Sequence, residues 1–340
     1  MQPAGNLFNV PQASDLVRLA DGERPRFWVT IDTEEDFDWS QPFSCTAYSL
    51  GSVPALAECQ AYFERASVQP IYLVDWPIVT DDRAHDILGR AAQEGRCEIG
   101  AQLHPWVNPP HEEEVNEKNS YTGNLPRALQ RAKMTRLRDA IRDRFGAAPL
   151  AYRAGRYGLG ADTAALLAEL GFRCDTSVRA GFDYRAGHGP DYRAAPLHPW
   201  WVETDAGAVL EIPVTTVFGG LLGRLGPSVY HRLEQSGARA ALARFGFVER
   251  IALTPEGIPA ERALEAIDIA IAQQLPVLNF SFHSPSLQPG NTPYVRDAAD
   301  LEHFYRWWDM VLDHLARRGI EAATAAGIIA MAERAKPPIA

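Results

Sequence analysis

The chain has 340 residues, of which 46% are hydrophobic and 22% charged, as is typical of a globular protein with a substantial core. Its formal net charge of −10 argues against nucleic acid as a partner, because a polyanion would be repelled. No stretch approaches the roughly 20 apolar residues of a membrane-spanning helix, and the N-terminus lacks the apolar run of a signal peptide. The four cysteines form no CxxC pair, which predicts free thiols in a reducing compartment. We therefore expect a soluble, cytoplasmic protein with neither a membrane nor a nucleic-acid partner.

Residues 1–25 are polar and aperiodic, which predicts a flexible arm followed by a single domain over 26–336. Within that domain, apolar and β-branched runs predict strands, and apolar residues at helical spacing predict helices. In the first half, the expected strands are 27–32, 69–75, 97–102 and 150–153, and the expected helices are 53–66, 81–94, 125–145 and 161–170.

A long polar loop follows the expected strand 97–102, and its HEEE run at 111–114 is expected to face water. The second half of the chain continues the alternation. The expected strands are 172–177, 209–215 and 277–283, the expected helices are 261–273 and 297–318, and a short strand with a closing helix is expected over 319–335. Such alternation predicts an α/β fold, with a parallel sheet covered by helices. About eight units predict a closed or nearly closed barrel, with a doubly wound open sheet as the alternative. No glycine-rich phosphate loop follows the first strand, which argues against nucleotide binding.

Polar side chains with catalytic potential follow the expected strands directly. In parallel α/β folds such positions meet at the carboxyl ends of the strands, where active sites lie. The set comprises Asp32, Glu34, Gln102, His104, Arg153, Asp175 and His283. Taken singly, each residue is more often structural, as a turn former, a helix cap or a satisfied buried group. Together they supply a base, a cation that tunes it and an acid, which suits hydrolysis of an amide or an ester.

Aromatic residues are expected near the same rim, among them Trp39, Trp106 and Tyr157. Aromatic faces stack well on sugar rings, which would suit a carbohydrate site. Packing in the core or in loops is the alternative for each of them.

Four motifs in this order resemble those of the polysaccharide deacetylases, which are carbohydrate esterases with a distorted (β/α) barrel of about seven to eight strands. They are TIDTEEDFDW, EIGAQLHPWVNPP, YRAGRYG and FSFHSPSLQPGNTPYV. The resemblance covers roughly residues 27–335. The DTEEDFDW and HPW forms resemble an atypical branch of the family, whose members often have no known substrate.

The resemblance implies hydrolytic removal of an acetyl group from an N-acetylated sugar or a related amide, in a small molecule or an oligosaccharide. It implies that Asp32 is the general base, that Arg153 tunes it, and that His283 is the general acid. An acidic residue commonly orients that histidine, and Asp175 is the candidate. Members usually hold a divalent metal, commonly zinc, through a carboxylate and two histidines, with the metal polarising the acetyl carbonyl and the attacking water.

The metal motif departs from the family pattern in this chain. Thr33 replaces the carboxylate next to Asp32, so Glu34 is the nearest candidate ligand. His104 is present, but the common pattern has a second histidine four residues earlier, where Gly100 stands, and a shorter spacing would need one at the position of Gln102. Glu34, Gln102 and His104 are the candidate ligands, although zinc prefers histidine, cysteine or carboxylate. Two further hypotheses therefore stay open. One is a metal-independent hydrolase of cyclic amides, as found in some relatives on this fold, and the other is a non-catalytic sugar-binding protein.

Overall fold

The computed structural model describes residues 6–8, 10–20, 22–38, 40–220 and 249–335. Trp39, one of the expected aromatic residues, lies outside the described residues.

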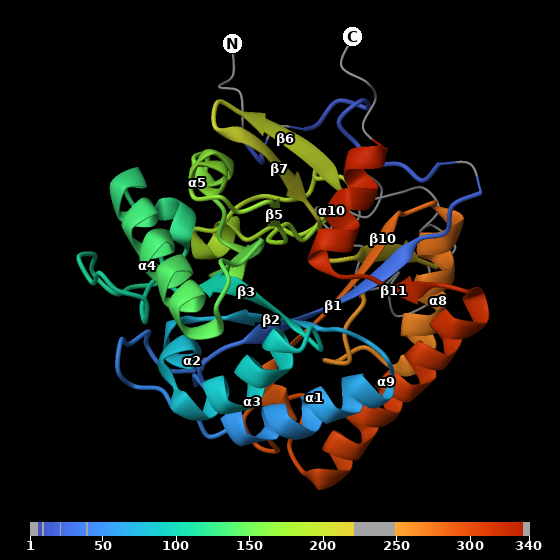
Figure 1. Ribbon diagram of the computed structural model, residues 1–340, viewed down its shortest axis with the longest axis horizontal. Helices are drawn as coiled ribbons and strands as arrows, with labels where there is room; N and C mark the ends of the chain where they lie inside the picture. The colour runs from blue at the N-terminus through green and yellow to red at the C-terminus, as the bar shows by residue number, and fades with distance from the viewer. Residues whose placement is uncertain (1–5, 9, 21, 39, 221–248, 336–340) are drawn as a thin grey trace.

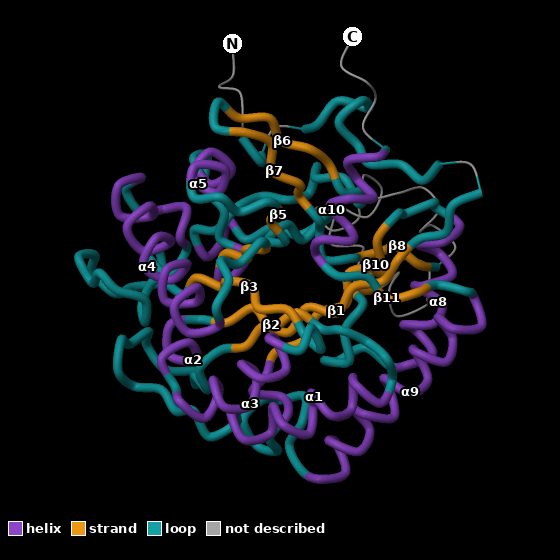
Figure 2. The backbone as a smooth tube through the Cα atoms, in the orientation of Figure 1, coloured by secondary structure: helices purple, strands orange, loops and turns teal. Residues whose placement is uncertain are grey.

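A curled sheet forms the centre of the molecule, with the strand order β10-β1-β2-β3-β4-β5-β7-β6 and with β11 paired to the start of β1 (Figures 1 and 2). Its strands are β1 (Arg26–Thr33), β2 (Ile71–Val74), β3 (Glu98–Leu103), β4 (Ala151–Ala154), β5 (Cys174–Asp175), β6 (Trp200–Thr204), β7 (Gly207–Glu211), β10 (Val277–His283) and β11 (Glu321–Ala322). All neighbours pair in parallel except the hairpin of β6 and β7. The predicted distorted (β/α) barrel is confirmed, and β6 is an antiparallel edge strand that the sequence pattern did not predict.

An irregular segment over 212–215 bridges the two edges of the curled sheet. The Val214 amide donates to the Val178 carbonyl (3.0 Å), and the Thr215 amide donates to the Asn279 carbonyl on β10 (3.1 Å). The strand expected over 209–215 ends at Glu211, because Pro213 has no amide hydrogen to donate to a ladder. The chain then forms a second, antiparallel pair of strands, β8 (Thr216–Gly219) and β9 (Glu249–Ala252), which was not predicted.

Most helices surround the sheet on its outer side, and the last one packs over the amino ends of the strands (Figures 1 and 2). The helices are α1 (Leu56–Arg65), α2 (Trp76–Thr80), α3 (Asp82–Gln93), α4 (Arg127–Phe145), α5 (Thr163–Glu169), α8 (Ala260–Ala272), α9 (Ala298–Arg318) and α10 (Ala325–Arg334), with short 3-10 turns η1 (Val53–Ala55), η2 (Thr122–Asn124), η3 (Gly155–Tyr157), η4 (Arg185–Gly187) and η6 (Ser284–Leu287). Every predicted helix is present, and among the α-helices of the described residues only the five-residue α2 was not predicted. That helix begins at the cap of Asp75, whose Oδ1 accepts a hydrogen bond from the Ile78 amide (2.9 Å). None of the helices described is long and apolar enough to cross a membrane.

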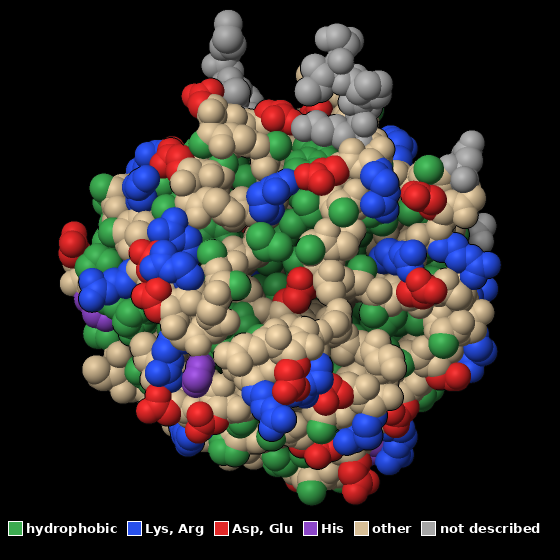
Figure 3. Space-filling model, in the orientation of Figure 1, with side chains coloured by type: hydrophobic (Ala, Val, Ile, Leu, Met, Phe, Trp, Pro, Cys, Tyr) green, Lys and Arg blue, Asp and Glu red, His purple; other side chains and the backbone are tan. Residues whose placement is uncertain are grey.

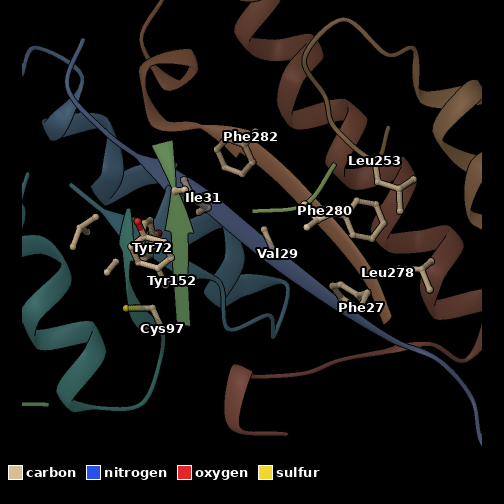
Figure 4. Close-up of a cluster of buried hydrophobic side chains, with 14 of the residues drawn as sticks. Phe27, Val29, Ile31, Tyr72, Cys97, Tyr152, Leu253, Leu278, Phe280 and Phe282 are labelled. Atoms are coloured by element: carbon tan, nitrogen blue, oxygen red, sulfur yellow. The ribbon is translucent and has the colours of Figure 1, made fainter. Parts of the chain in front are cut away.

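Alternation along β1 separates an outer face from an inner face. Phe27, Val29 and Ile31 point to the same side as Phe280 and Phe282 of β10, into the layer between the sheet and the helices (Figure 4). The alternate residues face the barrel interior.

The barrel interior changes from apolar to charged along the strands. Trp28 belongs to a buried cluster at the amino ends of the strands, where Ile328 of α10 also packs. One step further along β1, the Thr30 hydroxyl contacts Asn279 (3.2 Å) and Arg153 (3.0 Å). The next inward position is Asp32. The strand register thus delivers polar groups to the carboxyl end of the barrel.

Part of the predicted N-terminal arm lies against the edge of the sheet. The Val17 amide donates to the Pro199 carbonyl (2.8 Å), and the Trp201 amide of β6 donates to the Asp15 carbonyl (2.9 Å). Val17 is buried. These contacts attach residues 15–17 to the barrel.

The HEEE run does not lie wholly in water, contrary to the prediction. Glu113 is almost fully buried and pairs with the buried Lys133 of α4 (2.9 Å). Lys133 also donates to the carbonyls of Pro105 (3.0 Å) and Asn108 (2.6 Å). Because a buried ammonium must be compensated, this lysine draws Glu113 inward and fixes the loop that carries His104.

Candidate active site

A cavity of about 200 Å³ lies at the carboxyl ends of β1, β3, β4 and β10. Seven of the residues singled out from the sequence line it: Asp32, Glu34, Gln102, His104, Arg153, Tyr157 and His283. Asp175 and Trp106 do not. The other lining residues are Tyr121, Ala154, Arg156, Arg179 and Tyr184.

Arg153 holds Asp32 at the base of this cavity. Both side chains are buried, and the Arg153 Nη1 forms an ion pair with Asp32 Oδ1. The other guanidinium hydrogens reach the Ser281 hydroxyl (2.8 Å), the Thr30 hydroxyl (3.0 Å) and the Thr176 carbonyl (2.9 Å). A guanidinium with this many partners cannot turn freely, so it fixes the orientation of the carboxylate.

His283 faces Asp32 from β10, which is the neighbour of β1 in the sheet. Its Nε2 lies 3.5 Å from Asp32 Oδ2, and its Nδ1 lies 2.7 Å from Glu256 Oε2. The other oxygen of Glu256 accepts from the His283 amide (3.1 Å) and from the Ser286 hydroxyl (2.6 Å). Burial alone would lower the pKa of His283, but the charges of Glu256 and Glu34 raise it to about 10. His283 therefore carries a proton at neutral pH.

The carboxylate beside His283 is Glu256 and not Asp175, which the sequence analysis had chosen. Asp175 accepts hydrogen bonds from the Ser177 hydroxyl (2.7 Å) and amide (3.1 Å), on the far side of β4. It lies in register with Glu211 of β7. The choice failed because the stretch IALTPEG (251–257) was not recognised as a strand followed by an acidic turn, the pattern used for every other candidate.

His104 is oriented by two acidic residues that were not predicted. Its Nδ1 lies 2.9 Å from Glu35 Oε2 and 3.8 Å from Asp75 Oδ2. The Trp106 ring stacks on the imidazole, with centroids 4.4 Å apart, and its Nε1 donates to Glu35 Oε1 (2.8 Å). Trp106 was expected to offer its ring to a sugar at the rim. Because the residue is buried, it supports His104 instead.

Glu35, Asp75 and His104 together form a buried group that could hold a metal ion. However, both oxygens of Asp75 already accept hydrogen bonds, from the Ile78 amide (2.9 Å) and the Glu35 amide (3.0 Å). Burial and the neighbouring Glu35 also raise the pKa of Asp75 well above its usual range, which favours a protonated carboxyl. An imidazole that contacts a carboxylate through Nδ1 has its Nε2 directed elsewhere, as is common for metal-binding histidines.

The other face of His104 meets the two remaining candidate ligands inside the cavity. His104 Nε2 lies 3.4 Å from Glu34 Oε2, and the Gln102 amide nitrogen lies 3.3 Å from the same oxygen. Gln102 Oε1 is buried without a hydrogen-bond partner among the described residues. Burial raises the pKa of Glu34 to about 8, since a carboxylate here lacks solvent. A divalent cation among Glu34, Gln102 and His104 would give Gln102 Oε1 a partner and would compensate the charge of the Glu34 carboxylate. This set therefore fits a metal better than the group of Glu35, Asp75 and His104.

Backbone geometry brings the end of β4 close to His104. A Cβ on Gly155 would lie 2.3 Å from the Cδ2 of His104, so only glycine fits there. The next two residues, Arg156 and Tyr157, have φ values of 55° and 59°. Left-handed conformations are strained for such residues and cluster at functional sites. This turn places both side chains on the cavity wall.

Comparison with known proteins shows the fold but no family. No family model matches the chain, and no curated protein matches it. An allantoinase named Puue is similar over 97% of this chain and 100% of its own, with a TM-score of 0.51 and 15% identity. A 4-alpha-glucanotransferase from Thermococcus litoralis is similar over 91% of this chain and 40% of its own, with a TM-score of 0.54 and 12% identity.

A third solved structure, a family 4 carbohydrate esterase from Streptomyces lividans in complex with acetate, has a TM-score of 0.42 and 10% identity. The match covers 88% of this chain and 93% of the esterase. The two structures with TM-scores above 0.5 show a shared barrel fold.

Proposed function

We propose that this chain hydrolyses the amide bond of an N-acylated compound, with an N-acetylated sugar as the leading substrate class. The observation that carries this proposal is the pairing of two dyads across one cavity. Asp32 is held by Arg153, His283 is held by Glu256, and their facing atoms are 3.5 Å apart. Amide hydrolysis needs a base for the attacking water and an acid for the departing nitrogen at one carbonyl.

The two dyads differ in the roles that they support. The Asp32 carboxylate is a proton acceptor, and it accepts the proton of the attacking water. His283 is protonated, because the Glu256 carboxylate stabilises the imidazolium, and it donates to the leaving nitrogen. Arg153 keeps Asp32 oriented toward the cavity, and Glu256 keeps the imidazole in place. Tyr157, on the cavity wall, offers a ring against which a substrate can pack.

A divalent metal fits the cavity at Glu34, Gln102 and His104, with zinc as the first candidate. When bound, it would polarise the acyl carbonyl and lower the pKa of a bound water. Glu35 and Trp106 would hold His104 in the orientation that presents Nε2 to the cavity.

A second candidate function is the metal-independent hydrolysis of a cyclic amide. Gln102 favours it, because a neutral amide oxygen is a weak zinc ligand. The fold shared with an allantoinase also supports it. Activity that survives exhaustive chelation would favour this candidate, and activity that is lost on chelation and restored by zinc would favour the first.

The decisive test is acetate release from N-acetylglucosamine and related amides by the wild type and by Asp32→Asn. The variant keeps the shape of the side chain, and we expect a loss of about 100- to 10,000-fold in kcat. Asp313→Asn, an exposed position on α9, is the matched control and should keep full activity. Asp32→Asn activity within tenfold of the wild type, in a folded protein, would show that Asp32 is not the base. No turnover by the wild type on any amide would favour the sugar-binding hypothesis.

A further inference from the structure

Arg179, which follows β5, lines the cavity without an acidic partner. Its Nη1 donates to the Tyr184 hydroxyl (3.0 Å), and its guanidinium carbon lies 4.0 Å from the centroid of the Phe182 ring. Its Nε has no hydrogen-bond partner, and no carboxylate forms an ion pair with it among the residues that the structure describes. Arg153 already pairs with Asp32, so the presence of a second guanidinium in this cavity needs another explanation.

Arg156 adds a second cation to the same wall. The left-handed turn at Arg156 and Tyr157 directs it there, and its guanidinium carbon lies 4.2 Å from the centroid of the Tyr121 ring. The nearest carboxylate is that of Glu117, at 3.8 Å and largely exposed to water. Strain at this turn is maintained only if the surrounding structure requires the placement.

The charges of the cavity do not cancel on this wall. Asp32 is matched by Arg153, and His283 is matched by Glu256. Glu34, the other carboxylate that lines the cavity, contacts Gln102 and His104. Arg156 has only the long pair with the exposed Glu117, and Arg179 has no ion pair among the described residues, in a chain whose formal net charge is −10. On the molecular face seen in Figure 3, acidic and basic side chains are interspersed. A general excess of basic residues in the chain therefore does not account for the two arginines on this wall.

The two cations lie close to the proposed reacting centre. The Tyr157 ring is shared, because the guanidinium carbons of Arg153 and Arg179 lie 6.0 Å and 4.8 Å from its centroid. One aromatic ring thus separates the group that holds Asp32 from Arg179. The cavity of about 200 Å³ is smaller than the roughly 300–1,000 Å³ of sites for drug-sized ligands, which favours a compact substrate.

We propose that Arg179, assisted by Arg156, forms a subsite for an oxyanion of the substrate, so that the preferred substrate is an anionic N-acylated sugar. This inference rests on the proposed amide hydrolysis and names its substrate class. A carboxylate and a phosphate share the chemistry that a guanidinium recognises. A neutral N-acetylated sugar would leave Arg179 without a counter-charge in a partly desolvated wall, and it would bind less well.

Three probes that differ at one carbon test this subsite. N-acetylglucosamine carries a hydroxymethyl group at C6, its uronic acid carries a carboxylate there, and its 6-phosphate carries a phosphate. We expect the wild type to prefer one of the anionic probes by at least about tenfold in kcat/KM. In Arg179→Gln that preference should fall by about 10- to 100-fold, the value of a hydrogen bond to a charged group. Arg306→Gln on α9 removes the same charge at an exposed site and is the matched control.

Binding measured with Asp32→Asn by equilibrium dialysis separates this inference from the proposed function. Tighter binding of an anionic probe, lost when Arg179→Gln is added, supports the subsite even if no amide is turned over. Equal binding and equal turnover of all three probes would overturn the subsite and leave the hydrolase proposal intact. An equal loss of preference in Arg179→Gln and Arg306→Gln would show a general effect of charge and would also overturn it. If Arg179→Gln does not fold, Arg156→Gln and Arg179→Lys serve instead, and an unchanged preference in both would refute the subsite.

Discussion

The two ends of the barrel differ in what their cavities can do. A cavity of about 1090 Å³ lies at the amino ends of the strands, between the start of β1, β11, α10 and the loops that precede β2 and β3. It is more than five times as large as the 200 Å³ cavity at the carboxyl ends. Yet its charged residues pair with one another in partly exposed positions, as Arg26 does with Glu321 and Arg96 with Glu64.

The smaller cavity gathers buried groups whose charges perturb one another. Glu34 and His283 both have raised pKa values there, and Gln102 Oε1 has no hydrogen-bond partner among the residues described. Groups that are desolvated and incompletely satisfied are the ones that a substrate or cation can stabilise. The volume of a cavity therefore does not identify the candidate site in this protein, whereas buried ionisable groups without full electrostatic compensation do.

The largest expected effect on stability concerns the apolar base beneath the charged end. Ile328 of α10 is fully buried in the cluster that contains Trp28. Ile328→Ala should lower the free energy of unfolding by about 2–5 kcal/mol, because it leaves a cavity. Denaturant unfolding would measure this, and kcat of the folded fraction should not change. Ile269→Ala on α8, a partly buried position, is the control with a smaller loss, and an equal loss at both positions would contradict the prediction.

At the charged end, Glu256→Gln should lower kcat by about 100-fold, because His283 loses the charge that keeps it protonated. With Glu256 present, the imidazolium persists up to about pH 10. Removing the charge lowers the pKa of His283, so the alkaline limb of the kcat/KM profile should move to lower pH. An alkaline limb that stays in place would show that another group is the acid.

The same raised pKa predicts a pH dependence of stability. The ion pair of His283 with Glu256 stabilises the folded state fully below the ordinary histidine pKa of 6.5, and this stabilisation is lost as the pH rises through about 10. Glu256→Gln should therefore flatten the unfolding free energy over that window.

A smaller effect is expected when the ligand set is completed. Gln102→His should raise zinc affinity by at least about tenfold, because imidazole replaces a neutral amide oxygen. In the wild type, affinity should increase with pH up to about 8, since a cation must displace the proton of Glu34. Competition titration with a zinc indicator would measure both. Equal affinities of wild type and Gln102→His would place the metal elsewhere, with the buried group of Glu35 and Asp75 as the next candidate.

The smallest effect is expected at the rim of the large cavity. Arg26→Gln breaks a pair whose side chains are 43% and 75% exposed, so water and salt already screen it. The free energy of unfolding, measured by thermal denaturation, should change by less than about 1 kcal/mol, and the variant should keep full activity. A loss of activity in this variant would mean that the large cavity takes part in function after all.

Sequence patterns alone predicted the barrel and most of the residues that line the cavity. Alternating strand and helix periods are local patterns, and they predicted the helices and the parallel strands with small shifts of boundary. Because parallel strands present their carboxyl ends at one edge, position after a strand was enough to gather Asp32, Glu34, His104 and His283.

The pairing of side chains across that cavity could be seen only in the three-dimensional structure. Glu256 reaches His283 from a loop 27 residues earlier in the chain, and Glu35 and Asp75 reach His104 from two other strands. Trp106 packs against His104, and Arg179 has no ion pair with an acidic residue in the part of the chain that the structure describes. Period and spacing fix where a side chain leaves its own strand, but its partner depends on how separate loops pack together, and no local pattern encodes that packing.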